Sequence, residues 1–134
     1  YENEVYDGIP QLLKFLKEQK KTIILATSKP EAFAKRILEH FHLAPYFDFI
    51  AGATMDETRS EKADIIAYAI EQCQITDSSM AVMVGDRKYD ILGAKQFGMA
   101  SIGALFGFGS REELEEAGAS YLTETPQEIM KIFK

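Results

Sequence analysis

The chain has 134 residues, of which 46% are hydrophobic and 27% charged, with a net charge of -6 and a pI of about 5.0. These values are typical of a globular domain with one core, and the acidic balance argues against a protein that coats nucleic acid. The only cysteine, Cys73, excludes an internal disulfide and favours a cytoplasmic location. No apolar run is long enough to cross a bilayer, so we expect no membrane as a partner. The acidic balance leads us to expect no nucleic acid as a partner either.

The first part of the chain predicts a helix, a strand and a second helix. Apolar residues at helical spacing predict a helix over 10–19, and the run 22–26 predicts a buried strand. Ser28 and Glu31 form a capping-box pattern, with Pro30 in the first turn of the helix that they open. The N-terminus of such a helix can hold an anion, although a capped helix with no ligand is the better explanation of this junction taken alone.

The rest of the chain continues the alternation of strand and helix. Strands are predicted over 47–51, 80–84, 100–105 and 120–122, and helices over 61–72, 90–97, 110–118 and 127–133. Ser110 and Glu113 form a second capping box, and Gly118 ends the helix that they open. The series predicts the α/β class, with a Rossmann-like parallel sheet, helices on both faces and a single domain over 1–134.

The stretch V-M-V-G-D-R-K-Y-D at 82–90 is the most informative in the chain. Its valines suit a strand buried on both faces, and Asp86 follows the strand at the edge where open α/β sheets bind ligands. Asp90 comes four residues later and can fold back beside Asp86. Two adjacent carboxylates predict a Mg²⁺ site for phosphate chemistry. The alternative is that Asp86 caps a helix and Asp90 is a solvated acid in its first turn.

Other polar residues come to the same predicted sheet edge. Thr27 supplies a hydroxyl and Lys29 a movable charge where the strand 22–26 ends. Lys62 lies in the first turn of a helix, where the helix dipole disfavours a cation, so it is a candidate for binding an acidic ligand. A solvated surface lysine is the simpler alternative for Lys62 alone. We interpret the G-F-G sequence at 107–109 as a flexible turn, because Glu112 stands where a dinucleotide fingerprint needs its third glycine.

Five segments resemble the haloacid dehalogenase-type (HAD) hydrolases, in the phosphoglycolate phosphatase-like branch. Three are short motifs: A-T-S-K-P at 26–30, R-S-E-K at 59–62 and G-D-R-K-Y-D at 85–90. Two are longer: I-L-G-A-K-Q-F-G-M at 91–99 and F-G-F-G-S-R-E-E-L-E-E-A-G-A at 106–119. They occur in the family's order and cover nearly the whole chain.

The resemblance implies a role for each candidate residue. Thr27 would bind the transferring phosphoryl group, and Lys62 would neutralise the charge of the phosphate and of the nucleophile. Asp86 and Asp90 would position Mg²⁺, Asp86 the more directly. Ser28 and Lys29 would line the substrate side. Catalysis would therefore depend on Thr27, Lys62 and Asp86.

One feature of the family is absent from these residues. Family members carry an aspartate nucleophile in a D-x-D motif on a first strand, which lies between the strands that match 23–27 and 81–85, and this sequence contains no D-x-D. We therefore expect the chain to be the C-terminal part of a longer enzyme, with residues 1–8 leaving a cap. Without that strand, two strand edges would be unprotected.

The resemblance implies Mg²⁺-dependent hydrolysis of a small phosphorylated metabolite through an aspartyl-phosphate. The nucleophile would lie outside these 134 residues, and the chain alone would be inactive. Two alternatives remain open. One is a nucleotidase or sugar-phosphate phosphatase. The other, for a chain that is complete, is a non-catalytic module that binds phosphate or a partner.

Overall fold

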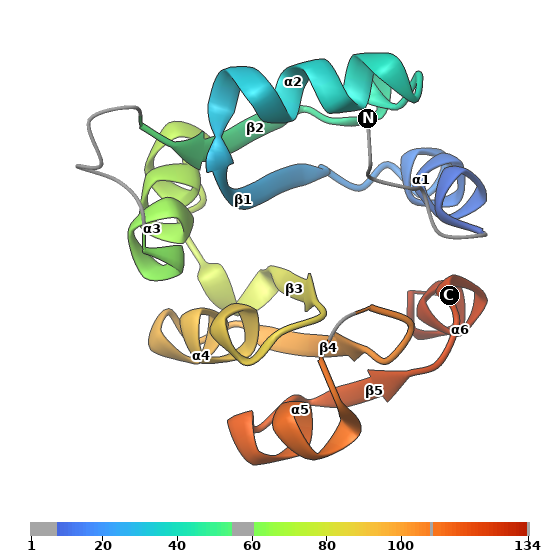
Figure 1. The fold of residues 1–134 in the computed structure, drawn as a ribbon, viewed down its shortest axis with the longest axis vertical. Helices are drawn as coiled ribbons and strands as arrows, with labels where there is room; N and C mark the ends of the chain where they lie inside the picture. The colour runs from blue at the N-terminus through green and yellow to red at the C-terminus, as the bar shows by residue number, and fades with distance from the viewer. Residues whose placement is uncertain (1–7, 55–60, 108, 134) are drawn as a thin grey trace. The chain divides into compact units, whose positions relative to one another are not determined.

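The computed structural model describes residues 8–54, 61–107 and 109–133 (Figure 1). The chain divides into two compact units, Tyr1–Cys73 and Gln74–Lys134, which are described in turn. Residues 1–7, which hold most of the predicted exit from a cap, and the start of the R-S-E-K motif lie outside the described residues. None of the helices in the described part is both long enough and apolar enough to span a membrane.

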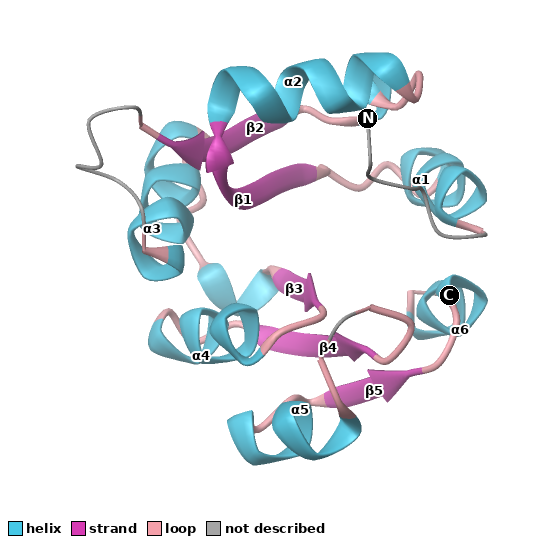
Figure 2. Cartoon of the chain, viewed as in Figure 1, coloured by secondary structure: helices cyan, strands magenta, loops and turns pink. Residues whose placement is uncertain are grey.

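The first unit is a two-stranded parallel sheet with helices around it (Figure 2). Its elements are α1 (Ile9–Glu18), β1 (Ile24–Pro30), α2 (Glu31–His40), the 3-10 turn η1 (Ala44–Tyr46), β2 (Phe49–Ala53) and α3 (Lys62–Gln72). Ile24 lies opposite Phe49, and Ala26 opposite Ala51.

Alternate residues of β1 pack into different apolar clusters, as the two-residue period of a strand requires. Leu25 packs with Leu13 of α1 and Leu38 of α2. Ile24 and Ala26, which are two residues apart, pack instead against a cluster that contains Ile65 of α3. Helices therefore cover both faces of this sheet, which is why β1 is apolar along its first half without interruption.

The second unit is a three-stranded parallel sheet in the order β3-β4-β5. Its elements are the 3-10 turn η2 (Ser78–Met80), β3 (Val82–Gly85), α4 (Lys88–Gln96), β4 (Ala100–Ala104), α5 (Arg111–Ala117), β5 (Tyr121–Thr123) and α6 (Pro126–Ile132). Ile91 of α4 and Leu114 of α5 are fully buried in one cluster, and Ile102 of β4 is fully buried as well.

The prediction of an α/β, Rossmann-like fold is confirmed, because both sheets are parallel and helices pack around them. Every predicted helix and strand is present, and most bounds agree within two residues. Thr125 caps α6 through the Glu128 N–H, and Ser110 caps α5 through the Glu113 N–H. Gly118 ends α5 with a positive φ of 92°, a conformation that glycine adopts without strain.

Two local predictions are wrong. The capping box at Ser28 and Glu31 does not form, because the chain stays extended through Pro30 and α2 begins at Glu31 with no side-chain cap. The strand β3 is not buried on both faces, since Val82 and Val84 are 37% and 41% exposed. Among the described residues, β3 pairs with β4 alone. A high valine content indicates that a strand prefers to be buried. It does not show which helix or strand would cover each face.

Asp48 joins three parts of the first unit. Its carboxylate accepts hydrogen bonds from the Ile23 N–H at 2.7 Å and from the Lys17 ammonium of α1. Its own N–H donates to the Ile23 carbonyl at 2.7 Å. The Lys17 ammonium and then the Ile23 N–H hold the pKa of Asp48 below its ordinary value of 3.8.

We predict that Asp48→Ala lowers the free energy of unfolding of the full-length protein by about 1 kcal/mol, because the side chain is partly exposed and screened. A carboxyl with a lowered folded-state pKa stabilises the fold above its unfolded pKa, so the contribution is present at pH 6. It is lost as the pH falls below 3.8 through the lower folded-state pKa. Urea titrations at several pH values measure this. The control is Asp64→Ala on the exposed face of α3, and an equal loss in the control would contradict the prediction.

Candidate active site

The carboxyl end of β1 leaves the regular strand pairing. Ala26 pairs with Ala51 and Pro30 with Ala53, so the intervening residues 27–29 form an irregularity. The Thr27 Oγ1 accepts a hydrogen bond from the Lys29 N–H at 3.2 Å, which stabilises this turn of the backbone. The Lys29 side chain is exposed and its ammonium lies over the Phe33 ring. Irregular strand ends of this kind are frequent next to binding sites, because they redirect side chains.

Lys62 comes to the same strand end from another element. It is the first residue of α3, and its ammonium donates a hydrogen bond to the Ala26 carbonyl at 3.0 Å. This contact explains why a lysine is tolerated in the first turn of a helix, since the carbonyl offsets the unfavourable helix dipole. Lys62 is half-buried and so is not the solvated surface lysine of the simpler alternative. The first unit therefore brings Thr27, Lys29 and Lys62 to one end of β1.

Asp86 and Asp90 lie on either side of the turn that joins β3 to α4. The N-cap of α4 is Arg87, so Asp86 does not cap the helix. The Asp90 carboxylate accepts a hydrogen bond from the Arg87 N–H at 3.4 Å and is only 8% exposed, so it is not a solvated acid. Both parts of the alternative interpretation of this turn are therefore wrong.

Two glycines make room for these carboxylates. A Cβ on Gly85 would overlap the Asp90 side chain, and a Cβ on Gly107 would overlap the Asp86 side chain. The loop after β4 also contacts Asp86 through its backbone, because the Gly109 N–H donates to the Asp86 carbonyl at 2.7 Å. Gly107 and Gly109, from the sequence that we interpreted as a flexible turn, therefore lie against Asp86, and a side chain at either position would overlap it.

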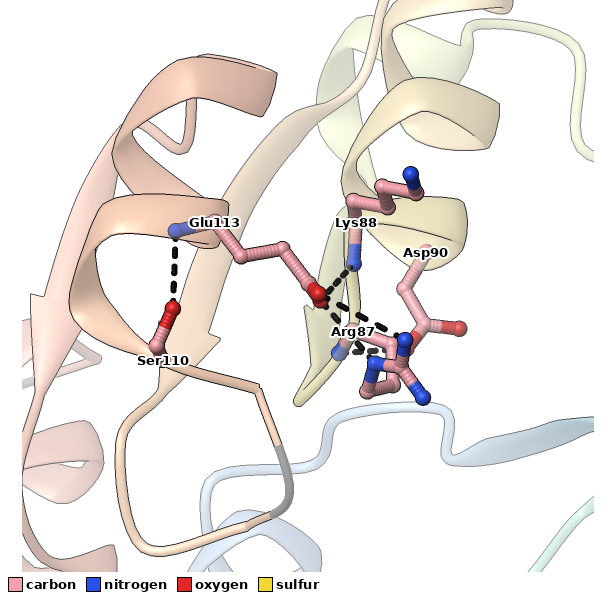
Figure 3. Close-up of polar contacts among 5 residues, drawn as sticks. All are labelled: Arg87, Lys88, Asp90, Ser110 and Glu113. Atoms are coloured by element: carbon pink, nitrogen blue, oxygen red, sulfur yellow. Dashed lines mark hydrogen bonds and ion pairs between the residues drawn. The ribbon is translucent and has the colours of Figure 1, made fainter.

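Arg87 and Glu113 form an ion pair beside the same turn (Figure 3). Glu113 Oε2 accepts from Arg87 Nε at 2.9 Å, and Oε1 accepts from Nη2 at 3.4 Å. Oε2 also accepts from the Lys88 N–H at 2.9 Å. Arg87 and then the Lys88 N–H hold the pKa of the Glu113 carboxyl below its ordinary value of 4.5. The sequence predicted only a capping box for Glu113 and indicated no role for Arg87.

The donor set of this turn fits a hard cation such as Mg²⁺. Mg²⁺ needs one or two carboxylates, with water and substrate oxygens as its other ligands, and Asp86 and Asp90 provide two on one turn, each packed against a glycine. No cluster of three or more His, Cys, Asp or Glu side chains suited to a metal lies among the residues that the structure describes. A dedicated site built wholly from protein ligands is therefore not indicated there.

A shallow groove of about 400 Å³ lies between α4 and α5 in the second unit. Its lining residues are Lys88, Leu92, Ser110, Glu112, Glu113, Glu116 and Ala117. Three glutamates make it a poor site for a phosphorylated ligand, because like charges repel. The strand ends therefore remain the better candidate.

The sequence profile of the haloacid dehalogenase-like hydrolases matches residues 1–98. The 5'-nucleotidase of Pseudomonas aeruginosa is 42% identical over 114 residues, which cover 85% of this chain and 51% of that protein. The phosphoglycolate phosphatase of Vibrio parahaemolyticus is 28% identical over 130 residues, which cover 97% of this chain and 57% of that protein. The chain thus spans about half the length of the curated relatives it matches.

Solved structures support the same assignment. The crystal structure of a predicted phosphatase from Clostridium acetobutylicum matches 97% of this chain with a TM-score of 0.94 and 48% identity, and the match covers 60% of that protein's chain. Together with the matching profile and the similarity to a phosphoglycolate phosphatase, this confirms the resemblance drawn from the motifs. The chain belongs to the haloacid dehalogenase-like hydrolases.

Proposed function

We propose that the full-length protein hydrolyses a small phosphate monoester with the help of Mg²⁺. The observation that supports this most directly is the turn from β3 to α4, where Gly85 and Gly107 leave room for two carboxylates. Membership of a hydrolase family agrees with it. Asp86 and Asp90 would hold the cation, and the cation would offset the negative charge of the phosphate oxygens.

In this proposal the carboxyl end of β1 binds the phosphoryl group and the rest of the substrate. Lys62, fixed by the Ala26 carbonyl, would place its ammonium beside the phosphate, and the Thr27 hydroxyl would donate to a phosphate oxygen. Ser28 and Lys29 would contact the rest of the substrate. Positioning and charge compensation of this kind account for most of the catalysis of phosphoryl transfer.

The covalent step needs a nucleophile from outside these 134 residues. An aspartate carboxylate would attack phosphorus, so that a new P–O bond forms as the P–O bond to the leaving alcohol breaks. The alcohol takes a proton from a general acid. Water then attacks the aspartyl-phosphate, which releases inorganic phosphate and restores the carboxylate. The chain described here would be inactive without that group.

We predict that Asp86→Asn in the full-length protein lowers Mg²⁺-dependent turnover by at least about 100-fold, because an amide cannot replace the charge of a carboxylate at a cation. Steady-state hydrolysis of p-nitrophenyl phosphate across a Mg²⁺ titration measures this. Asp64→Asn, the same change on an exposed residue of α3, is the matched control. Unchanged turnover in Asp86→Asn would refute the metal assignment.

We predict that Lys62→Met lowers kcat/KM by about 100-fold, because methionine keeps most of the apolar stem and removes the ammonium that would face the phosphate. Lys35→Met on the exposed face of α2 is the control and should stay near the wild-type value. A fall in melting temperature with normal kcat/KM would indicate that Lys62 only anchors α3 to β1.

The substrate class separates two versions of the proposal. The phosphoglycolate phosphatase-like motifs favour a small anionic phosphate ester, whereas the 42% identity to a protein named 5'-nucleotidase favours nucleoside 5'-monophosphates. We expect 2-phosphoglycolate to be hydrolysed with a higher kcat/KM than AMP or UMP in a phosphate-release assay. A higher kcat/KM for AMP or UMP would assign the protein to the nucleotidases. Sugar phosphates are tested in the same assay as the third class of substrate.

A further inference from the structure

The ion pair between Arg87 and Glu113 stands directly beside the proposed cation site. Arg87 lies between Asp86 and Lys88, and its N–H bonds the Asp90 carboxylate. Its guanidinium pairs with Glu113, and its backbone is adjacent to Asp86 in the chain. A guanidinium is a permanent cation that pairs readily with carboxylates, so at this position it competes with a metal ion for the same oxygens.

Glu113 is well placed to remove that competition. Its two oxygens bind Nε and Nη2 of Arg87, so the carboxylate holds the guanidinium by one edge. The Lys88 N–H, one of the backbone donors that the start of α4 leaves without a helical partner, is bound by the same carboxylate. Glu113 therefore fixes both the side chain and the backbone of the turn after Asp86 (Figure 3).

Glu113 is itself held in place from two sides. Its N–H donates to Ser110 Oγ at 3.1 Å, which fixes the first turn of α5. A Cβ on Gly109 would come within 3.0 Å of Glu113 Oε2, so Gly109 packs closely against the carboxylate. The Glu113 side chain is only 23% exposed, whereas its neighbours Glu112 and Glu116 on α5 are exposed.

We propose that Glu113 is a positioning residue for the cation site: it holds the Arg87 guanidinium away from Asp86 and Asp90 and fixes the turn that carries them. This inference rests on the proposed function, in which those two carboxylates hold Mg²⁺. Glu113 touches neither the metal nor the substrate and acts through Arg87.

The role predicts opposite effects for the two members of the ion pair. In E113Q the amide holds the guanidinium weakly, so Arg87 competes with the cation, and metal affinity falls by about 10-fold, as is usual for lost outer-shell partners. In R87Q no guanidinium remains, so metal affinity stays at the wild-type level or rises. The double variant R87Q/E113Q returns to within about 3-fold of wild type.

The experiment uses the full-length protein and measures Mn²⁺ binding by electron paramagnetic resonance, without substrate, alongside the Mg²⁺ dependence of turnover. E112Q is the matched control, because it removes the same charge from the same turn of α5 at an exposed side chain. Melting temperatures are recorded for each variant. If E113Q does not fold, E113D retains the charge with a shorter reach and takes its place, with a smaller expected loss of affinity.

Weaker Mn²⁺ binding in E113Q with recovery in R87Q/E113Q supports the role. Wild-type binding in E113Q overturns it, and so do equal losses in E113Q and R87Q, because an ion pair that only stabilises the fold would suffer equally from either change. D86N separates this inference from the proposed function. If D86N loses Mn²⁺ and E113Q does not, only the role of Glu113 fails, whereas wild-type binding in D86N refutes the cation site itself.

Discussion

The turn between β3 and α4 depends on close packing that only glycine permits. The Asp90 carboxylate lies against Gly85, and the Asp86 side chain lies against Gly107. Adding a Cβ at either position would push a carboxylate out of its place. The Asp90 carboxylate also accepts the Arg87 N–H at the start of α4, so it contributes to the local fold. The acidic groups on this turn are the basis for the cation site proposed above.

The sequence predicted what depends on nearest neighbours. Helix α1 follows from apolar residues at helical spacing, and the end of α5 follows from Gly118. The order of strands and helices gave the parallel sheets, because short connections leave few topologies. The sequence also predicted that Asp86 directly follows β3, because the valine-rich run ends at Gly85. The sequence could not show the exposure of Val82 and Val84, which depends on what packs against the strand.

Two occurrences of one motif show why the rest was harder to predict. Ser28 and Glu31 have the same spacing as Ser110 and Glu113, yet only Ser110 caps a helix. The backbone after Ser28 stays extended through Pro30, so the helix begins too late for the pattern to form. At the second occurrence, the Glu113 side chain binds Arg87 and the Lys88 N–H, more than twenty residues away in the chain. The spacing of residues in the sequence predicts a local helix cap well. It does not predict which distant residues a long glutamate side chain binds.

The same distinction applies to two of the ion pairs among the described residues. Asp48, which directly precedes β2, pairs with Lys17 of α1 and serves the packing of the first unit. Arg87 and Glu113 join the start of α4 to α5, and Arg87 is adjacent in the chain to Asp86 of the candidate site. A surface ion pair contributes little to stability, so the place of this pair beside the proposed cation site matters more. An arginine next to the proposed cation site would compete for its carboxylates, and the Glu113 carboxylate of α5 binds the guanidinium of that arginine.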